Sequence, residues 1–239
     1  MKNRLLLLSL SLSLSAILVG CSDNDNSNSS KANAESKQAQ KNSCISSYIK
    51  KPCALLTTEI VKKEFPQFPT DAEKNEIIQL QNCSYGWPSN SRTKTMKIAG
   101  REMTIPVSSE ISILWIKKKK IETALQGFKR SYRTLSEEEK VQAAAAMQKA
   151  LNERSDGLTE DQKSMAAGMS KGFLKNMKYE AVEGIGTAAA WGGVGAGGSS
   201  LKVLDGDTEF EISVNISDVE SDNKKLATAL AKSLIASCK

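Results

Sequence analysis

The residue types that carry most protein catalysis are unevenly represented in this sequence. Its 239 residues include five Cys and no His, which excludes a Ser-His-Asp triad, a Cys-His dyad and a His-ligated zinc. Acid–base catalysis near neutral pH would fall to a carboxylate, a Lys or a Tyr with a shifted pKa. The composition therefore favours a protein that is not an enzyme, and it indicates neither a cofactor nor a metal ion.

A glycine-rich segment matches the spacing of a nucleotide motif. Residues 193–198 fit G-x-G-x-x-G, but a dinucleotide site needs this motif to open a helix after a strand. The residues that follow, 201–204, are instead predicted to form a strand. We therefore expect a flexible loop over residues 192–200, which could cover a ligand.

Acidic residues alternate near the C-terminal end in a way that suggests calcium. They are Asp205, Asp207, Glu209 and Glu211. A calcium loop also needs Gly at its sixth position and Glu at its twelfth, and Phe210 and Ile216 stand there. A hairpin turn at Asp205-Gly206, followed by a strand with its acids facing solvent, is the interpretation we favour.

The densest positive stretch is a run of four lysines, Lys117, Lys118, Lys119 and Lys120. It is a candidate contact for an anionic glycolipid or a phosphate-bearing envelope polymer. The alternative is a solvated strand end that leads into a helix. The net charge of the chain is only +6, and a nucleic-acid binder concentrates far more positive charge, so no nucleic-acid partner is expected.

Apolar residues recur every four positions along a predicted helix. They are Met165, Met169, Phe173 and Met177, and this spacing places them on one helix face. Because Met side chains adapt their shape, the stripe could form a groove for an envelope protein. The interpretation we favour is helix packing, with Met147 of the preceding helix facing the stripe.

The N-terminus is organised as an export signal. Two basic residues precede an apolar stretch over residues 5–19, which suits a signal peptide and is shorter than the about 20 residues of a membrane-spanning helix. The stretch ends in Leu18-Val19-Gly20-Cys21, which resembles the lipobox of bacterial lipoproteins. The resemblance implies that residues 1–20 are removed and that Cys21 carries diacylglycerol and fatty acids such as palmitate. The alternatives are an ordinary cleaved signal and a short uncleaved anchor.

The segment after Cys21 is suited to separate a domain from a membrane. Residues 22–43 contain no apolar side chain larger than Ala, so they cannot bury enough surface to offset the entropy of ordering. We predict a lipid-anchored disordered linker over residues 21–43. In the lipoprotein family, Ser22 in this position implies the outer membrane of a diderm cell, on its periplasmic side or at the surface.

Four cysteines remain when Cys21 is assigned to lipid. An even number in an exported chain indicates two disulfides formed in an oxidising compartment, with three possible connectivities. We predict Cys53–Cys83, which would join the first helix to the first strand. We also predict Cys44–Cys238, which would join the two ends of the domain.

Residues 44–239 are predicted to form a single α+β domain. An antiparallel sheet is packed by an N-terminal and a C-terminal helix, and a helical hairpin is inserted at about residues 134–180. Capping boxes at Ser136/Glu139 and Thr159/Gln162 start the two hairpin helices. The expected helices cover residues 55–65, 120–132, 136–154 and 159–178 and begin again near 221, and the expected strands cover 77–87, 96–99, 103–107, 111–116, 187–191, 201–204 and 208–216.

Three motifs of this domain resemble a family of secreted, actinobacterial-type lipoproteins of unknown function. They are the run from Cys53 to Thr57, the run from Cys83 to Trp87, and Gly184-Ile185-Gly186, which is followed by Thr187 where Asp is usual. The resemblance covers about residues 52–90 and 182–236, and it implies the fold and the envelope location without any catalytic residues.

The expected function is that of a lipid-anchored envelope lipoprotein, acting as a non-catalytic binding or scaffold module. Its partners would be the membrane, through the lipid, and an envelope protein or an anionic envelope polymer. One alternative is an inhibitor or immunity-type protein that blocks an envelope enzyme through the helical hairpin. Another is an enzyme without His, working beneath the glycine-rich loop.

Overall fold

The computed structural model describes residues 42–98, 101–153, 159–195 and 198–238. All of them belong to one of the two units into which the chain divides. Cys21, the lipobox and residues 1–41 lie outside the described residues, so the lipid anchor and most of the linker stay predictions.

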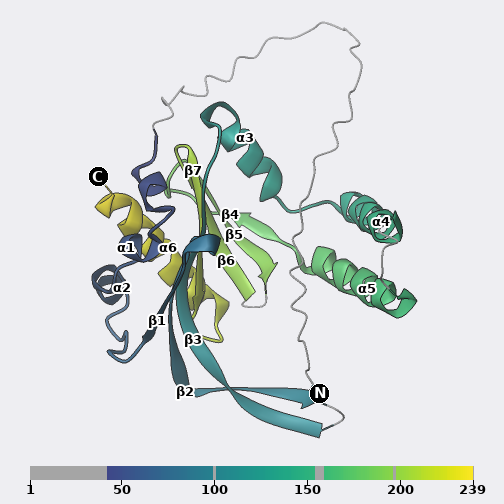
Figure 1. Ribbon diagram of the computed structural model, residues 1–239, viewed down its shortest axis with the longest axis horizontal. Coiled ribbons are helices and arrows are strands. Elements are labelled where there is room, and N and C mark those ends of the chain that lie inside the picture. The colour runs from purple at the N-terminus through teal and green to yellow at the C-terminus, as the bar shows by residue number, and fades with distance from the viewer. Residues whose placement is uncertain (1–41, 99–100, 154–158, 196–197, 239) are drawn as a thin grey trace, which may run out of the picture. The chain divides into compact units, whose positions relative to one another are not determined.

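Seven strands form one antiparallel sheet in the order β1-β2-β3-β7-β6-β5-β4. Strands β1 to β3 form one part of the sheet and β4 to β7 the other, and the pairing of β3 with β7 joins them (Figure 1). The helical and strand content confirms the predicted α+β class. The strands are β1 (Glu73–Ile77), β2 (Asn82–Ile98), β3 (Arg101–Lys118), β4 (Tyr179–Ala181), β5 (Ala188–Gly195), β6 (Gly198–Asp205) and β7 (Thr208–Asn215).

The helices occupy the start, the middle and the end of the described chain. They are η1 (Cys44–Tyr48), α1 (Pro52–Leu55), α2 (Thr58–Glu64), η2 (Ile78–Leu80), α3 (Ile121–Ser131), α4 (Glu137–Glu153), α5 (Glu160–Asn176) and α6 (Glu220–Ser237). The predicted helix over residues 55–65 is divided into α1 and α2. Thr57 adopts an extended conformation between them and caps α2 by accepting a hydrogen bond from the Ile60 amide.

The main core lies on one face of the sheet. Along β7 the alternation places Phe210, Ile212 and Val214 on this face, where all three are buried, as predicted. Leu230 and Leu234 of α6 belong to the same buried cluster, and α1, α2 and η1 also pack there. The first and last helices therefore cover this face, as the sequence predicts.

A smaller core covers part of the opposite face. Ala124 and Phe128 of α3 pack against Ala190 of β5 and Leu204 of β6. The helix was expected at residues 120–132, but its place on this face was not predicted. On the same side of the sheet, Glu209 and Glu211 of β7 alternate with the core residues of that strand.

Strands β2 and β3 are much longer than predicted. The expected strands at 96–99, 103–107 and 111–116, with the second half of the one expected at 77–87, correspond to two strands of 17 and 18 residues. The first half of the strand expected at 77–87 is wrong, because Ile77 ends β1 and Ile78–Leu80 form η2. The register of the pair shifts between Pro88 and Thr93, because proline cannot donate to the ladder and is accommodated at irregular positions.

A buried arginine holds this irregular segment. Arg92 is 8% exposed, and its guanidinium donates to the Asn215 side chain at 2.9 Å and to the Asn215 carbonyl at 3.0 Å. It also donates to the Ser108 carbonyl and the Ser109 hydroxyl, each at 3.2 Å. One side chain thus joins β2 to β3 and to the end of β7.

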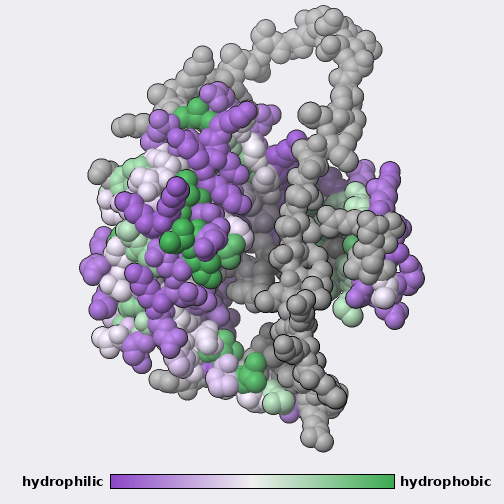
Figure 2. All heavy atoms as spheres, in the orientation of Figure 1, coloured by the Kyte–Doolittle hydropathy of each residue, from purple (hydrophilic) through white to green (hydrophobic). Residues whose placement is uncertain are grey.

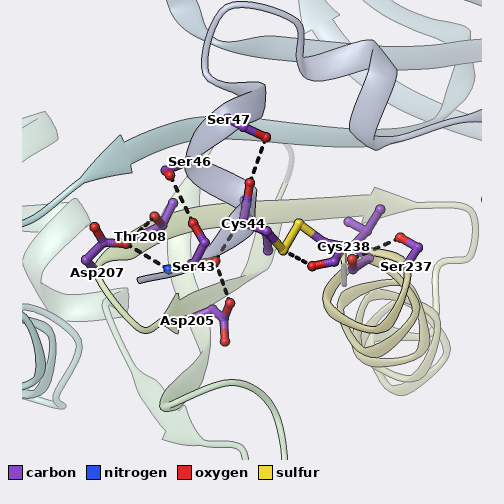
Figure 3. Close-up of a disulfide and its surroundings, with 11 residues drawn as sticks. Ser43, Cys44, Ser46, Ser47, Asp205, Asp207, Thr208, Ser237 and Cys238 are labelled. Atoms are coloured by element: carbon purple, nitrogen blue, oxygen red, sulfur yellow. Dashed lines mark hydrogen bonds between the residues drawn. A yellow bond between two sulfur atoms is a disulfide. The ribbon is translucent and has the colours of Figure 1, made fainter. Parts of the chain in front are cut away.

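Both disulfides have the predicted pairing. Cys44–Cys238 joins residues 194 positions apart, and Cys53–Cys83 joins residues 30 positions apart. Figure 3 shows the first pair, which connects the residue after Ser43 to the end of α6.

The start of the domain is fixed by the turn between β6 and β7. The Ser43 amide donates to Asp207 at 3.1 Å, and its hydroxyl donates to Asp205 at 2.5 Å (Figure 3). Two expectations are therefore wrong. Ser43 belongs to the folded domain and not to a disordered linker, and Asp207 is 1% exposed instead of facing solvent.

Asp207→Asn is expected to lower the free energy of unfolding by about 2 kcal/mol near neutral pH, as hydrogen bonds to a charged group are lost. Burial alone raises the pKa of the Asp207 carboxyl. Hydrogen bonds from the Ser43 amide and the Thr208 hydroxyl, together with the Lys118 ammonium, outweigh burial and hold this pKa below its ordinary value of 3.8.

This lowered pKa fixes the sign of the pH dependence. The charged Asp207 stabilises the fold fully above the ordinary pKa, and the stabilisation is lost as the pH falls through the lower pKa of the folded state. Denaturant titrations of wild type and Asp207→Asn should therefore differ at pH 7 and converge in acid below about pH 4. A gap that stays constant with pH would contradict this assignment.

Candidate binding site

The four lysines at 117–120, a predicted contact for an anionic partner, do not form one free positive patch. Lys118 is ion-paired with Asp207 at 3.3 Å, and Lys119 with Glu209 at 3.1 Å. The Lys117 ammonium instead lies 4.9 Å from the centre of the Trp115 ring, and Lys120 precedes α3 as its N-cap residue. The run therefore divides into two ion-paired lysines, one lysine that faces an exposed aromatic ring, and one at the start of α3.

A bulge in β3 turns Trp115 away from the core. The register with β7 shifts between Leu114 and Lys117, so Ile116 is buried while Trp115 is 42% exposed. Trp115 has a φ of 56°, a left-handed conformation that is a genuine outlier for a bulky residue. Bulges and strained residues of this kind cluster at functional sites, where they redirect a side chain.

Trp115 borders a pocket of about 250 Å³ on the outward face of the sheet. Part of its wall is Tyr132, whose ring packs against the rings of Phe128 and Tyr179 at centre-to-centre distances of 4.8 and 5.4 Å. The pocket is lined by Trp115, Lys117, Tyr132, Lys202, Glu209, Phe210 and Glu211.

The two carboxylates of the pocket are held by neighbouring side chains. Glu209 accepts a hydrogen bond from the Tyr132 hydroxyl at 2.8 Å. Glu211 accepts one from the Ser200 hydroxyl at 2.7 Å and is ion-paired with Lys202. The pKa of Tyr132 is raised well above its ordinary value, mainly by burial and then by the charge of Glu209 and the hydrogen bond to it. Tyr132 therefore stays a neutral donor.

One lysine at the pocket, Lys117, is not paired with any carboxylate that the structure describes. Lys119 and Lys202 pair with Glu209 and Glu211. In the part of the chain that the structure describes, Lys117 has no carboxylate within ion-pair distance. The site can therefore offer an aromatic surface, paired donors and acceptors, and one uncompensated positive charge.

The predicted methionine stripe lies on the inserted helical hairpin. Met165 and Met169 of α5 are 68% and 71% exposed, so the helix packing that we favoured for them is wrong. Met177 follows α5 and is half-buried, while the Phe173 side chain lies outside the described residues. Figure 2 shows apolar residues among hydrophilic ones over this hairpin.

Helices α4 and α5 pack against each other, and α4 has no buried residue. Both predicted capping boxes are present, with Ser136 and Glu139 at the start of α4 and Thr159 and Gln162 at the start of α5. A hollow of about 690 Å³ is lined mainly by small and apolar side chains of both helices, including Val141, Ala144, Met147, Ala167 and Leu174.

The glycine-rich segment is not the flexible loop predicted from the sequence. Its described residues continue β5 and β6, and Gly192 pairs with Ser200 and Gly195 with Gly198. A Cβ at Gly192 would lie 2.0 Å from the Lys178 carbonyl oxygen, which explains the glycine there by close backbone approach. Ser199 and Trp191 both donate to Glu220 at the start of α6, at 2.6 and 3.0 Å.

Comparison with protein-family models, with curated proteins and with solved structures finds no match for this chain. Within the described ranges, no helix is long and apolar enough to cross a bilayer. Over the same ranges, no three Cys, Asp or Glu side chains gather in a group that could hold a metal ion.

Sequence reasoning missed Trp115 and Tyr132. Residues 111–116 read as one apolar strand, in which Trp115 would be an ordinary core residue. The available signal was Trp115 beside four lysines, because a Trp at the boundary between an apolar strand and a positive run is suited to a surface aromatic contact.

Proposed function

We propose that this protein is a lipid-anchored, non-catalytic binding module of the cell envelope. The observation that supports binding best is the pocket at Trp115, where an exposed aromatic side chain is held in a strained backbone conformation. The two disulfides support export, and the lipobox resemblance ending at Cys21 supports the anchor. In a diderm cell the expected location is the outer membrane.

The anchor is tested by Cys21→Ala in cells fed a fatty-acid probe. We expect the unaltered protein to take up the label and to sediment with membranes, and the variant to do neither. Equal labelling and equal sedimentation of both proteins would reject the lipid anchor.

Binding is tested separately with the lipid-free Cys21→Ala protein and isolated cell envelopes. The domain should cosediment with envelopes in a saturable way, and Trp115→Asn should reduce this binding. Asparagine is suitable because it tolerates positive φ. Saturable binding that does not respond to Trp115→Asn would place the binding surface elsewhere.

A second candidate function is that of an inhibitor or immunity-type protein whose hairpin contacts an envelope enzyme. It is favoured by the exposed apolar side chains of Val141, Met165 and Met169 on an element that has little packing of its own against the sheet. A photocrosslinker placed at Met165 in intact cells should then join the hairpin to an enzyme. The same group at Lys62, an exposed residue of α2, is the matched control.

Deleting the hairpin is expected to leave the sheet folded. Its two ends meet at Thr134, whose hydroxyl donates to the Tyr179 carbonyl at 2.9 Å and accepts from the Tyr179 amide at 3.0 Å. Replacing residues 136–177 by a short Gly-Ser linker should thus shift the melting temperature by only a few degrees. Loss of cooperative unfolding would show that the hairpin is part of the core.

A further inference from the structure

We propose that the Trp115 pocket binds a saccharide ring that carries an acidic group, either a carboxylate or a phosphate. This inference rests on the proposed binding function and adds the chemical class of the ligand. Three features of the pocket support it: the aromatic surface, the paired polar groups and the uncompensated cation.

The aromatic surface suits the apolar face of a sugar. Trp115 is 42% exposed although the bulge that presents it requires a φ of 56°. An exposed aromatic ring can pack against the C–H groups on one face of a pyranose while the hydroxyls project sideways. The pocket, at about 250 Å³, is smaller than the about 300–1,000 Å³ typical for drug-sized ligands, and it therefore suits a single ring.

The polar groups are arranged in adjacent donor–acceptor sets. Glu211 is held by Ser200 and Lys202, and the Lys202 ammonium also donates to the Ser200 hydroxyl at 3.0 Å. Glu209 is held by Tyr132 and Lys119. A sugar hydroxyl donates and accepts at the same time, so neighbouring carboxylate and ammonium groups can satisfy both of its functions.

Lys117 selects for the acidic group. Among the described residues it is the pocket lysine without a carboxylate partner, and its ammonium lies over the Trp115 ring. A carboxylate or phosphate on a sugar stacked against Trp115 would therefore meet a positive charge that no residue of the pocket neutralises.

The test measures binding of galacturonic acid, glucose 6-phosphate and glucose to the lipid-free Cys21→Ala protein by calorimetry. The first two sugars distinguish a carboxylate from a phosphate, and glucose is the neutral reference. We expect the better acidic sugar to bind several-fold more tightly than glucose, with a preference that shrinks as salt is added. Trp115→Asn should weaken binding of every sugar at least tenfold, and Trp115→Phe, which keeps an aromatic face, should retain most of it.

Lys117→Gln separates charge from stacking. It should bring the affinity for the acidic sugar down to that for glucose, whereas Lys62→Gln, with the same change of net charge on α2, should leave the preference for the acidic sugar as in wild type. Melting temperatures check that each variant is folded.

Three outcomes would overturn the proposal. They are unchanged affinities in folded Trp115→Asn, an unchanged acidic preference in Lys117→Gln, and the absence of saturable binding of any of these sugars at millimolar concentrations. If no sugar binds but envelope binding still depends on Trp115, only the saccharide proposal is rejected and the proposed binding function stands. If envelope binding is absent as well, the proposed function also fails.

Discussion

Removing the Cys44–Cys238 disulfide by substituting both residues with Ala will lower the free energy of unfolding by about 5 kcal/mol. The bond closes a loop of 194 residues, and the entropy that a crosslink removes from the unfolded chain grows with loop length. The loop closed by Cys53–Cys83 spans 30 residues, so replacing that pair by Ala should lower the free energy of unfolding by about 4 kcal/mol. Denaturant titration of the purified protein measures both values.

Reduction of the wild-type protein provides the control for these substitutions. Reduction breaks both bonds without altering side-chain packing elsewhere, so a reduced protein should be less stable than either double variant. If the Cys44/Cys238 variant unfolds at the same denaturant concentration as wild type, the bond does not constrain the unfolded chain and the loop-length argument fails.

Arg92→Leu is expected to lower the free energy of unfolding by about 3 kcal/mol. The substitution removes four hydrogen bonds to three residues of β3 and β7, and it takes the arginine donor away from the side-chain oxygen and the carbonyl of Asn215. Leaving buried polar groups unpaired costs more than the hydrogen bonds contribute when they are formed. Denaturant titration checks this value against the wild-type chain.

Arg130→Leu is the matched control, because Arg130 is exposed on α3. The same change there should alter the free energy of unfolding by no more than about 0.5 kcal/mol. Arg92→Lys adds a second comparison, since a single ammonium keeps the charge but cannot reach four acceptors in fork geometry. Wild-type stability in both Arg92 variants would show that the arginine does not hold the bulge.

The elements with a complete local pattern could be predicted from the sequence. Residues 208–216 alternate between apolar and polar types, and β7 buries Phe210, Ile212 and Val214 as this pattern requires. The capping boxes before α4 and α5 were predictable for the same reason, since each is a contact between residues three positions apart. The disulfides followed from placing two cysteines at the ends of the domain and two near its first elements.

Features that depend on distant contacts could not be predicted. Asp207 lies in a polar turn sequence, yet Ser43, 164 positions away, covers it and buries its carboxylate. Pro88 and Pro106 both lie within the long β2–β3 pair, although proline cannot donate to the ladder. Trp115 belongs to an apolar run, which suggests a core residue, and only the register of β3 against β7 shows that a bulge directs it outward.

The Cys44–Cys238 bond also determines how mechanical tension would enter the domain. If the chain is tethered at Cys21, as we propose, drag on the domain pulls through the linker and reaches Cys44 directly after Ser43. The covalent bond shares this force with the end of α6, so η1 cannot be peeled away from the domain while the bond is intact. The domain would resist shear in the envelope until the bond is reduced, and extension under force should then begin at Ser43.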